Sequence, residues 1–341
     1  MGIILIRCDG GTLLGTGHII RELMIARELQ KNTHATIEFL MRNTQEGIKK
    51  IEKEGFSVKR LPKTLTLDDE ANFIADYIKS KGADLLIVDI LDTSKNYMSI
   101  LKTTGIKIVS FDDHSKGKYL ADLRFNILEL DKETPAFNLF EGPKYVTLDP
   151  VYADYHTKEK EIRENANKVL ITFGGSDPGN LTNKTLRASE KFDRKLEINV
   201  VIGFAFPHIE GLESNLKKSK HKIKLHKNIS AQEIAELMFE NDISIGAGGL
   251  TQYEFVSIGL PAFIICENVR HQYELANWFE NKGALINLGM GKHISEEMIV
   301  LRITELLNDY LKRQKMSRAA KILCDGKGLK RTVDKILEVL Q

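Results

Sequence analysis

Short apolar runs alternate along this chain with longer segments in which apolar residues recur at helical spacing. Short buried strands separated by amphipathic helices are typical of parallel sheets with crossover helices. In the first half, the pattern predicts strands at Ile3 to Cys8, Thr36 to Met41, Phe56 to Leu61, Leu85 to Ile90 and Lys107 to Asp112. With helices between them, this half predicts a doubly wound α/β domain.

The alternation stops at a polar segment, Asp149 to Asn167, and then restarts. The second half predicts strands at Lys168 to Phe173, Leu196 to Ile202, Lys222 to His226, Ile243 to Gly246 and Ala262 to Cys266. The full chain has 341 residues, which exceeds the roughly 250 to 300 residues at which a single hydrophobic core stops growing. We therefore expect an N-terminal domain over 1–150, a linker over 151–167, a second doubly wound domain over 168–310 and terminal helices over 311–341. Ligands bind at the carboxyl ends of such strands, so a cleft between the two domains is expected.

The composition is that of an ordinary globular protein and argues against nucleic-acid-binding and membrane-spanning proteins. The net charge is +2, 42% of residues are hydrophobic, and no basic patch interleaved with aromatic residues indicates nucleic acid. No apolar run approaches the roughly 20 residues that span a bilayer. The start lacks the charged region and cleavage site of a signal peptide. We therefore expect a cytoplasmic protein with no nucleic-acid partner and no membrane span.

Cysteines and one basic stretch offer limited chemistry. Cys8, Cys266 and Cys324 are widely spaced without a CxxC pair, which favours reduced thiols over a disulfide framework or a zinc site. Cys8 is expected to pack rather than act as a nucleophile. A late helical stretch carries Lys312, Arg313, Lys315, Arg318 and Lys321. Such a run is usually a solvated helix face, with peripheral contact to an anionic membrane surface, or to a phosphate, as the alternative.

The most informative loop follows the first strand and runs from Asp9 to Arg21. A dinucleotide-binding loop needs a third glycine where this chain has Ile20, and a Walker loop needs a Lys that is missing here. The loop therefore favours neither NAD binding nor ATP hydrolysis. Gly15 and Gly17 allow a tight turn that keeps side chains away from a ligand. His18 then stands at the helix start, either as an acid–base catalyst or as a helix cap.

Two glycine-rich loops follow strands of the second half. Gly174, Gly175 and Ser176 suit a phosphate or a sugar, although a tight turn with Ser176 or Asp177 as helix cap explains them equally well. The second loop runs from Gly246 into a helix.

In that second loop, Gly248 and Gly249 would leave the N–H groups of Leu250 and Thr251 open to a diphosphate. Glu254, one turn further, could accept both hydroxyls of a ribose. The alternative is a glycine-lined helix start with a solvent-facing Glu254.

A third cluster, Arg270 to Glu274, follows the strand Ala262 to Cys266. Its members His271 and Gln272 could contact sugar hydroxyls or serve simply as helix-start residues.

The ordered motifs resemble a known family. They are Arg7 to Gly11, Gly15 to Arg21, Phe111 to Asp113, Gly142 to Tyr145, Ile171 to Pro178 and Gly248 to Thr251. Together they are similar to the nucleotide-sugar hydrolase of pseudaminic acid biosynthesis and to the spore coat polysaccharide biosynthesis proteins. The resemblance implies a glycosyltransferase-B fold, in which two Rossmann-like domains face each other across a cleft. It also implies that the C-terminal domain holds UDP and that His18 lies beside the anomeric carbon.

The implied reaction is hydrolysis of a UDP-linked deoxy-amino sugar, with His18 as general base and no metal or cofactor required. Helix N-termini at Gly174 to Asp177 and Gly248 to Thr251 would stabilise the departing diphosphate. Substrate contacts are assigned to Asp9, Gly15, Gly17, Arg21, His271 and Gln272, and nucleotide contacts to Gly174, Gly175, Ser176, Gly248, Gly249, Leu250, Thr251 and Glu254. The alternatives are a glycosyltransferase of the same fold, a 2-epimerase and a non-catalytic binder.

One segment departs from the family pattern. Where hydrolases of the pseudaminic acid pathway tend to carry an aromatic residue, this chain has Asp89 to Thr93, so a different sugar pocket is expected. Asp112, Asp113 and His114 either line the cleft or form a turn. The sequence leaves open which sugar is bound and which oligomer forms.

Overall fold

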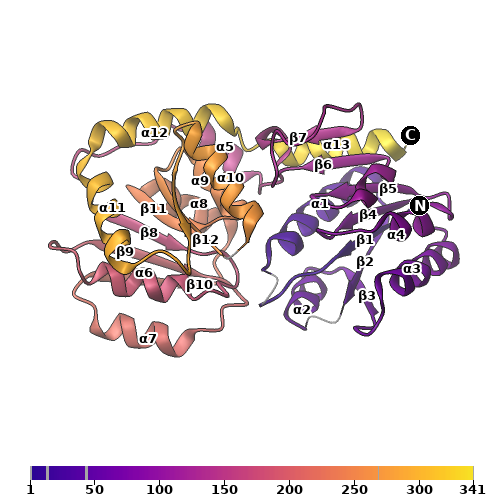
Figure 1. The fold of residues 1–341 in the computed structure, drawn as a ribbon, viewed down its shortest axis with the longest axis horizontal. Coiled ribbons are helices and arrows are strands. Elements are labelled where there is room, and N and C mark those ends of the chain that lie inside the picture. The colour runs from indigo at the N-terminus through magenta and orange to yellow at the C-terminus, as the bar shows by residue number, and fades with distance from the viewer. Residues whose placement is uncertain (1, 13–14, 43–44, 268, 341) are drawn as a thin grey trace. The chain divides into compact units, whose positions relative to one another are not determined.

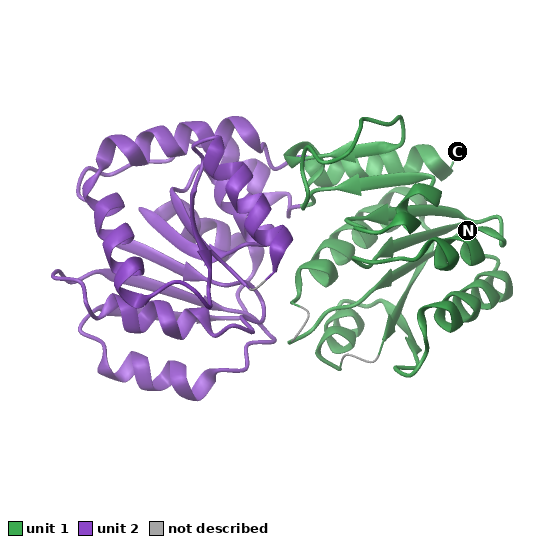
Figure 2. Cartoon of the chain, viewed as in Figure 1, with its two compact units in different colours: residues 1–147, 328–341 green, residues 148–327 purple. Residues whose placement is uncertain are grey.

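The computed structural model describes residues 2–12, 15–42, 45–267 and 269–340 and contains two parallel α/β sheets (Figure 1). Leu13 and Leu14 of the first glycine-rich loop lie outside the described residues. Unit 1 comprises Met1–Thr147 and Gly328–Gln341, and unit 2 comprises Leu148–Lys327 (Figure 2).

The described part of unit 1 forms a seven-stranded parallel sheet in the order β3-β2-β1-β4-β5-β6-β7. The strands are β1 (Ile3–Cys8), β2 (Thr36–Arg42), β3 (Ser57–Leu61), β4 (Leu85–Asp89), β5 (Lys107–Phe111), β6 (Leu123–Asn126) and β7 (Leu139–Glu141). The helices are α1 (Gly17–Thr33), α2 (Gln45–Lys53), α3 (Leu67–Lys81), α4 (Lys95–Lys102), the 3-10 turns η1 (Lys116–Leu120) and η2 (Pro143–Tyr145), and α13 (Gly328–Leu340). The strand order reverses between β1 and β4, and ligands bind at such a switch point in open α/β sheets.

Successive side chains of β1 point to opposite faces of the sheet, as a strand requires. Ile4, Ile6 and Cys8 join the core beneath α1, α2 and α13, whereas Leu5 joins the core beneath α3 and α4. Both faces of the sheet are therefore buried, which explains why its central strands have near-continuous apolar runs.

The described part of unit 2 forms a six-stranded parallel sheet in the order β10-β9-β8-β11-β12-β13. Its strands are β8 (Lys168–Thr172), β9 (Glu197–Ile202), β10 (Lys222–Lys227), β11 (Ile243–Ala247), β12 (Ala262–Cys266) and β13 (Ile286–Met290). Its helices are α5 (Val151–Thr157), α6 (Leu181–Ser189), α7 (Ile209–Lys218), α8 (Ala231–Glu240), α9 (Leu250–Ile258), α10 (Arg270–Asn281), α11 (Glu296–Asn308) and α12 (Tyr310–Leu323). The switch point of this sheet lies between β8 and β11, so both glycine-rich loops of the second half follow its two central strands.

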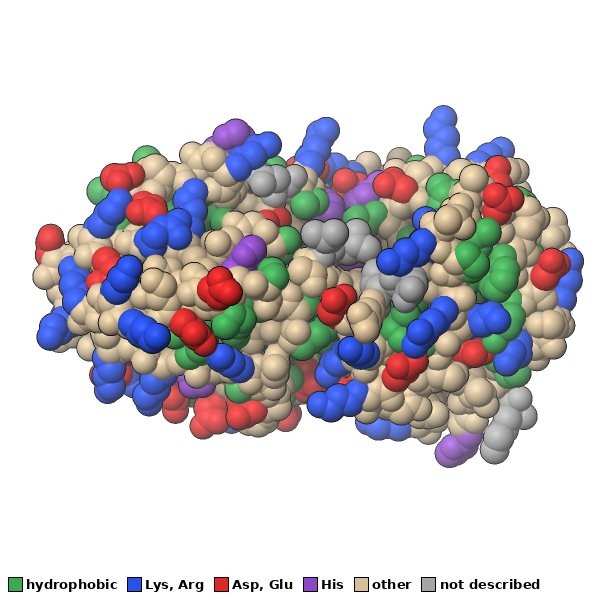
Figure 3. Space-filling model, turned by 90° about the horizontal axis from the view of Figure 1, so that it is seen from below, with side chains coloured by type: hydrophobic (Ala, Val, Ile, Leu, Met, Phe, Trp, Pro, Cys, Tyr) green, Lys and Arg blue, Asp and Glu red, His purple; other side chains and the backbone are tan. Residues whose placement is uncertain are grey.

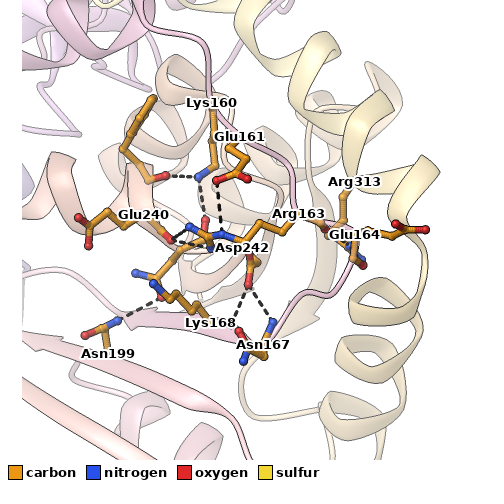
Figure 4. A network of polar contacts seen from close by, with 12 residues as sticks. Lys160, Glu161, Arg163, Glu164, Asn167, Lys168, Asn199, Glu240, Asp242 and Arg313 are labelled. Atoms are coloured by element: carbon orange, nitrogen blue, oxygen red, sulfur yellow. Dashed lines mark hydrogen bonds and ion pairs between the residues drawn. The ribbon is translucent and has the colours of Figure 1, made fainter.

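The segment predicted as a linker, 151–167, belongs to unit 2 and is bonded to its helices (Figure 4). The buried ammonium group of Lys160 donates to the carbonyl oxygens of residues 238, 239 and 241, at 3.1, 2.6 and 2.7 Å. The buried guanidinium of Arg313 donates to the carbonyl oxygens of residues 306 and 307, and to those of residues 163 and 164. Because the last carbonyl groups of a helix lack partners within it, these cations complete the ends of α8 and α11. They also fasten the segment to unit 2.

Each predicted strand is present, with ends that differ by at most one residue. The sequence pattern did not predict β6, β7 or β13. The chain also divides at other places than the predicted ones, because α13 returns to unit 1. There it adds Leu329, Val333 and Ile336 to the core beneath α1.

Three features of the described residues bear on candidate partners. None of the described helices is both long and apolar enough to cross a membrane. Across the described ranges, no group of three His, Cys, Asp or Glu side chains is arranged to hold a metal ion. On the face drawn in Figure 3, Lys and Arg side chains lie among Asp and Glu side chains.

Helix α1 buries the carboxyl group of Glu22 close to Asp89. Glu22 is 0% exposed, and neither of its carboxyl oxygens has a hydrogen-bond partner among the described residues. Its nearest cation is the Nε of Arg21, 3.8 Å away. Burial, with a further contribution from Asp89, raises the pKa of Glu22 well above its usual value. Burial therefore favours the neutral form of this carboxyl group.

This burial predicts how stability depends on pH. The unfolded chain releases the Glu22 proton near its ordinary pKa of about 4.3, while the folded chain keeps it. The free energy of unfolding should therefore decrease as the pH rises above that value. Glu22→Gln should lack this dependence, because glutamine has no proton to release, whereas the parent should lose about 1.4 kcal/mol of stability per pH unit until its folded pKa is reached.

Urea unfolding at pH 5.5 and pH 8, followed by circular dichroism, measures this difference. Glu46→Gln, which removes an exposed acid from α2 of the same unit, is the matched control. An equal pH dependence in the parent and in Glu22→Gln would contradict the prediction.

Candidate functional site

The carboxyl ends of β1 and β4 bring His18 and Asp89 together at the switch point of unit 1. Asp89 ends β4 and pairs in register with Cys8 at the end of β1, while His18 lies in the first turn of α1. The Nδ1 of His18 is 2.7 Å from the Oδ1 of Asp89. The His18 side chain is 20% exposed and that of Asp89 is fully buried.

Arg21 holds Asp89 from the other side. Its Nε and Nη2 donate to the two oxygens of Asp89 at 3.0 and 2.5 Å, and its Nη1 donates to Asp112 at 2.5 Å. Burial alone would raise the pKa of Asp89, but Arg21 and His18 hold it well below the usual range. The carboxylate is therefore ionised and accepts hydrogen bonds.

This geometry assigns the two nitrogens of the His18 ring. An ionised Asp89 accepts a hydrogen bond, so the proton of the neutral imidazole lies on Nδ1 and the lone pair on Nε2. The ring is thus oriented as in a general base held by a carboxylate. The helix-cap alternative is not supported, because Thr16 is the N-cap of α1 and the imidazole bonds Asp89 instead.

The glycine-rich loop closes tightly ahead of His18. Gly15 has φ of 82° and accepts the N–H of Gly11 at 2.8 Å, and Gly17 is the first residue of α1. A side chain at Gly10 would meet Ile19 at 2.7 Å. By contrast, no atom of the described residues lies within 4 Å of a side chain built at Gly15, as expected where a ligand approaches backbone.

Asp9 and Arg21, predicted to contact substrate, both have structural partners. Asp9 accepts the N–H of Arg42 at 2.8 Å and pairs with the Nη2 of Arg7 at 2.7 Å. Arg21 is 2% exposed, and its three nitrogens all face carboxylates. The structure therefore supports a positioning role for Arg21, and direct substrate contact by either residue stays a prediction.

The cluster that follows β5, Asp112 to His114, bonds to neighbouring loops of unit 1. Asp112, with φ of 48°, accepts the N–H groups of residues 127 and 128 as well as Arg21. Asp113 binds the backbone and hydroxyl groups of Thr93 and Ser115, and His114 pairs with Glu129 at 3.2 Å. This arrangement favours the turn interpretation and fixes the loop that follows Asp89.

In unit 2, a side chain of the loop after β8 caps the helix that follows the loop. Gly174 has φ of 74°, and Gly175 accepts the N–H of Ala205 at 3.0 Å. Ser176 is buried. Asp177 accepts the N–H groups of residues 181 and 182 at 2.7 and 2.8 Å, which makes it a helix cap. The predicted helix N-terminus at Gly174 to Asp177 is therefore wrong, since α6 begins at Leu181 and its first N–H groups are already bonded.

The loop after β11 leaves its helix start open. Gly249 is the N-cap of α9. Among the described residues, no side chain caps this helix and no atom lies within 4 Å of a side chain built at Gly249. Leu250 is half-buried and Thr251 is buried. Uncapped N–H groups at a helix start favour an anion.

Glu254 lies one turn into α9, near Tyr152 of α5. Burial raises the pKa of Glu254 to about 7, Asp149 adds to the rise, and Tyr152 opposes it. Near neutral pH this carboxyl group is therefore poised between its charged and neutral forms.

Helix α10 brings two further predicted residues to this loop. A side chain at Gly248 would meet the Cβ of Gln272 at 2.7 Å, so α10 packs directly against the start of the loop. Gln272 accepts the N–H of Glu267 at 3.0 Å, and its amide N–H groups donate to no other residue that the structure describes. His271 is half-buried in the same first turn.

The sequence pattern did not identify Asp89 as the partner of His18. The available signal was a lone carboxylate at the end of an otherwise apolar strand, on the strand that the Rossmann order places beside β1. Cys8 is no competing nucleophile, because burial and its acidic neighbours raise its pKa well above the usual value.

Comparison with solved structures shows the fold. The chain superposes on MurG of Acinetobacter baumannii with a TM-score of 0.74 at 14% identity, covering 99% of this chain and all of that one. UDP-GlcNAc 2-epimerase of Neisseria meningitidis, solved bound to UDP-GlcNAc, gives a TM-score of 0.65 at 14% identity, with 99% and 100% coverage. The two parallel-sheet units thus form a glycosyltransferase-B-like fold.

Comparison with curated proteins shows the family, although no family model matches the chain. UDP-2,4-diacetamido-2,4,6-trideoxy-beta-L-altropyranose hydrolase of Campylobacter jejuni is 27% identical over 292 residues, covering 82% of this chain and 97% of that protein. The spore coat polysaccharide biosynthesis protein SpsG of Bacillus subtilis is 30% identical over 331 residues, covering 94% of each chain. The chain therefore belongs to the family of the spore coat polysaccharide biosynthesis protein SpsG.

Proposed function

We propose that this protein hydrolyses a UDP-linked deoxy-amino sugar at its anomeric carbon, for the biosynthesis of a surface polysaccharide. The observation that carries the proposal is the imidazole of His18, oriented by an ionised Asp89 at the switch point of unit 1. The relative from Campylobacter jejuni is named as a hydrolase of such a compound.

In the proposed reaction, the Nε2 of His18 takes a proton from water as the water oxygen bonds to the anomeric carbon. The bond between that carbon and the UDP oxygen breaks, and UDP leaves with the electron pair. Asp89 stabilises the imidazolium that forms, without taking its proton. His18 then returns the proton to solvent. General-base catalysis of this kind contributes about a hundredfold to ten thousandfold.

Unit 2 would bind UDP. The uncapped start of α9 suits the diphosphate, because its backbone N–H groups carry partial positive charge. Glu254 would accept the ribose hydroxyls in its ionised form. Gly174, Gly175 and Ser176 would line the neighbouring loop, while His271 and Gln272 would contact the sugar.

Transfer of the sugar to an acceptor is the second candidate. The same dyad favours it, since an imidazole oriented by a carboxylate deprotonates an acceptor hydroxyl as readily as water. The two reactions therefore differ in the nucleophile rather than in the base.

Incubation with a panel of UDP-linked amino sugars separates the candidates. We expect UDP and free sugar to appear by NMR without any acceptor, and equally in the presence of EDTA, because the proposed step uses only protein groups. Release that occurs only after an acceptor is added would instead establish the transferase.

Substitution of the dyad tests the chemistry. His18→Ala should lower kcat by at least about a hundredfold, and Asp89→Asn by a similar or smaller factor, because the amide no longer fixes the imidazole tautomer. UDP binding, measured by calorimetry, should persist in both. His34→Asn, at the other end of α1, is the matched control and should keep full activity. Near-parental turnover in His18→Ala would rule out the general-base role.

The ribose contact predicts that affinity depends on pH. Because the pKa of Glu254 is about 7, its carboxylate is lost as the pH falls from 8 to 6. The Kd for a UDP-sugar should then rise about fivefold. A UDP-sugar is the right probe, because its doubly esterified diphosphate does not titrate in this range.

Glu254→Gln should bind the UDP-sugar weakly at both pH values and lose the dependence. Glu236→Gln, which removes an exposed acid from α8, should behave as the parent does. The same pH dependence in Glu254→Gln would assign the titration to another group.

A further inference from the structure

The outer face of α12 carries three cations that the fold does not use. The basic stretch has five, but Arg313 is buried against backbone carbonyls, and Lys321 donates to a backbone carbonyl of unit 2 at 2.7 Å. Lys312, Lys315 and Arg318 are exposed and form no ion pair with any described residue. These three charges are therefore available to a partner.

Two large apolar side chains are exposed on the same face. Leu311 is 64% exposed and Ile322 is 84% exposed. Positions 311, 315, 318 and 322 follow the spacing of one helix stripe, so Lys315 and Arg318 lie between the two apolar residues. At about 1.5 Å per residue, the stripe is about 16 Å long.

The charge of this face is unopposed within the helix. No acidic residue occurs from Tyr310 to Leu323. The adjacent Asp309 is engaged as the N-cap, where it accepts the N–H of Lys312 at 2.9 Å. Figure 1 shows α12 along the outside of unit 2. This face, with cations and apolar side chains but no acidic residue from α12, differs from the face in Figure 3, where cations and anions are interspersed.

We propose that this face docks the protein on an anionic membrane surface. Lys312, Lys315 and Arg318 would meet the phosphate groups of lipid headgroups, and Leu311 and Ile322 would enter the boundary between headgroups and acyl chains. Basic residues flanked by apolar ones on one helix face are what such a surface attracts. The proposal is independent of the proposed function.

A second copy of the chain is a poorer occupant. Pairing of the same face across a two-fold axis would set cations against cations. A soluble anionic polymer would satisfy the three charges but would leave Leu311 and Ile322 in water. A lipid surface satisfies both kinds of side chain.

Co-sedimentation of the full chain with vesicles tests the proposal. We expect binding to vesicles of phosphatidylcholine mixed with phosphatidylglycerol, little binding to phosphatidylcholine alone, and weakening as salt screens the charges. Each cation should contribute about fivefold, so joint replacement of Lys312, Lys315 and Arg318 by Gln should weaken binding about a hundredfold. Leu311→Ser with Ile322→Ser should also weaken it.

A matched variant controls for net charge. Replacement of Lys217, Lys218 and Lys227 by Gln removes three exposed charges elsewhere on unit 2 and should leave vesicle binding unchanged. Thermal unfolding should be the same in both triple variants, which shows that both keep the fold. Equal binding to neutral vesicles, absence of binding to anionic ones, or an equal loss in the control would overturn the proposal. So would a change of oligomeric state in the α12 variant, which would assign the face to a second copy.

Discussion

The unit 1 site depends on the pairing of the Arg21 guanidinium with two buried carboxylates. The guanidinium spans the ends of two neighbouring strands by binding Asp89 and Asp112. Without this cation, carboxyl groups buried so close together would protonate rather than ionise. Glu22, beside them, lies 3.8 Å from the Nε of Arg21, and burial raises its pKa instead. One buried charge thus decides which carboxyl group is ionised, and the ionised one orients His18.

The fold was largely predictable because its strands are buried on both faces. A strand of this kind is a continuous apolar run, visible without knowledge of its neighbours. β6 and β7 gave no such signal: they are short, and β6 contains the buried Arg124. β13 contains Asn287 and Gly289 and pairs through an irregular register. The return of α13 to unit 1 was also hidden, because its apolar face does not indicate which core receives it.

The candidate site was predictable only in part. A glycine-rich turn ahead of a helix is a local pattern, so His18 could be singled out from the sequence. Its partner could not, because Asp89 lies 71 residues away in the chain and becomes a neighbour only through the strand order. Arg21 was assigned to substrate for the same reason, since its carboxylate partners are 68 and 91 residues distant. In unit 2, the start of α6 was predicted too early in the chain. Asp177 lies in the loop before the helix and caps it by accepting the N–H groups of residues 181 and 182.

The path of the chain bears on how the protein can be dissected. Unit 1 is discontinuous, and the polypeptide crosses between the units twice, after residues 147 and 327. Gly328 has backbone of Val146 so close that no side chain fits there, and Thr332 donates to the carbonyl oxygen of Tyr145 at 2.8 Å. A gene fragment ending at residue 147 would therefore encode an incomplete core. An autonomous first domain requires residue 147 to be spliced to 328, whereas unit 2 can be excised as one uninterrupted piece.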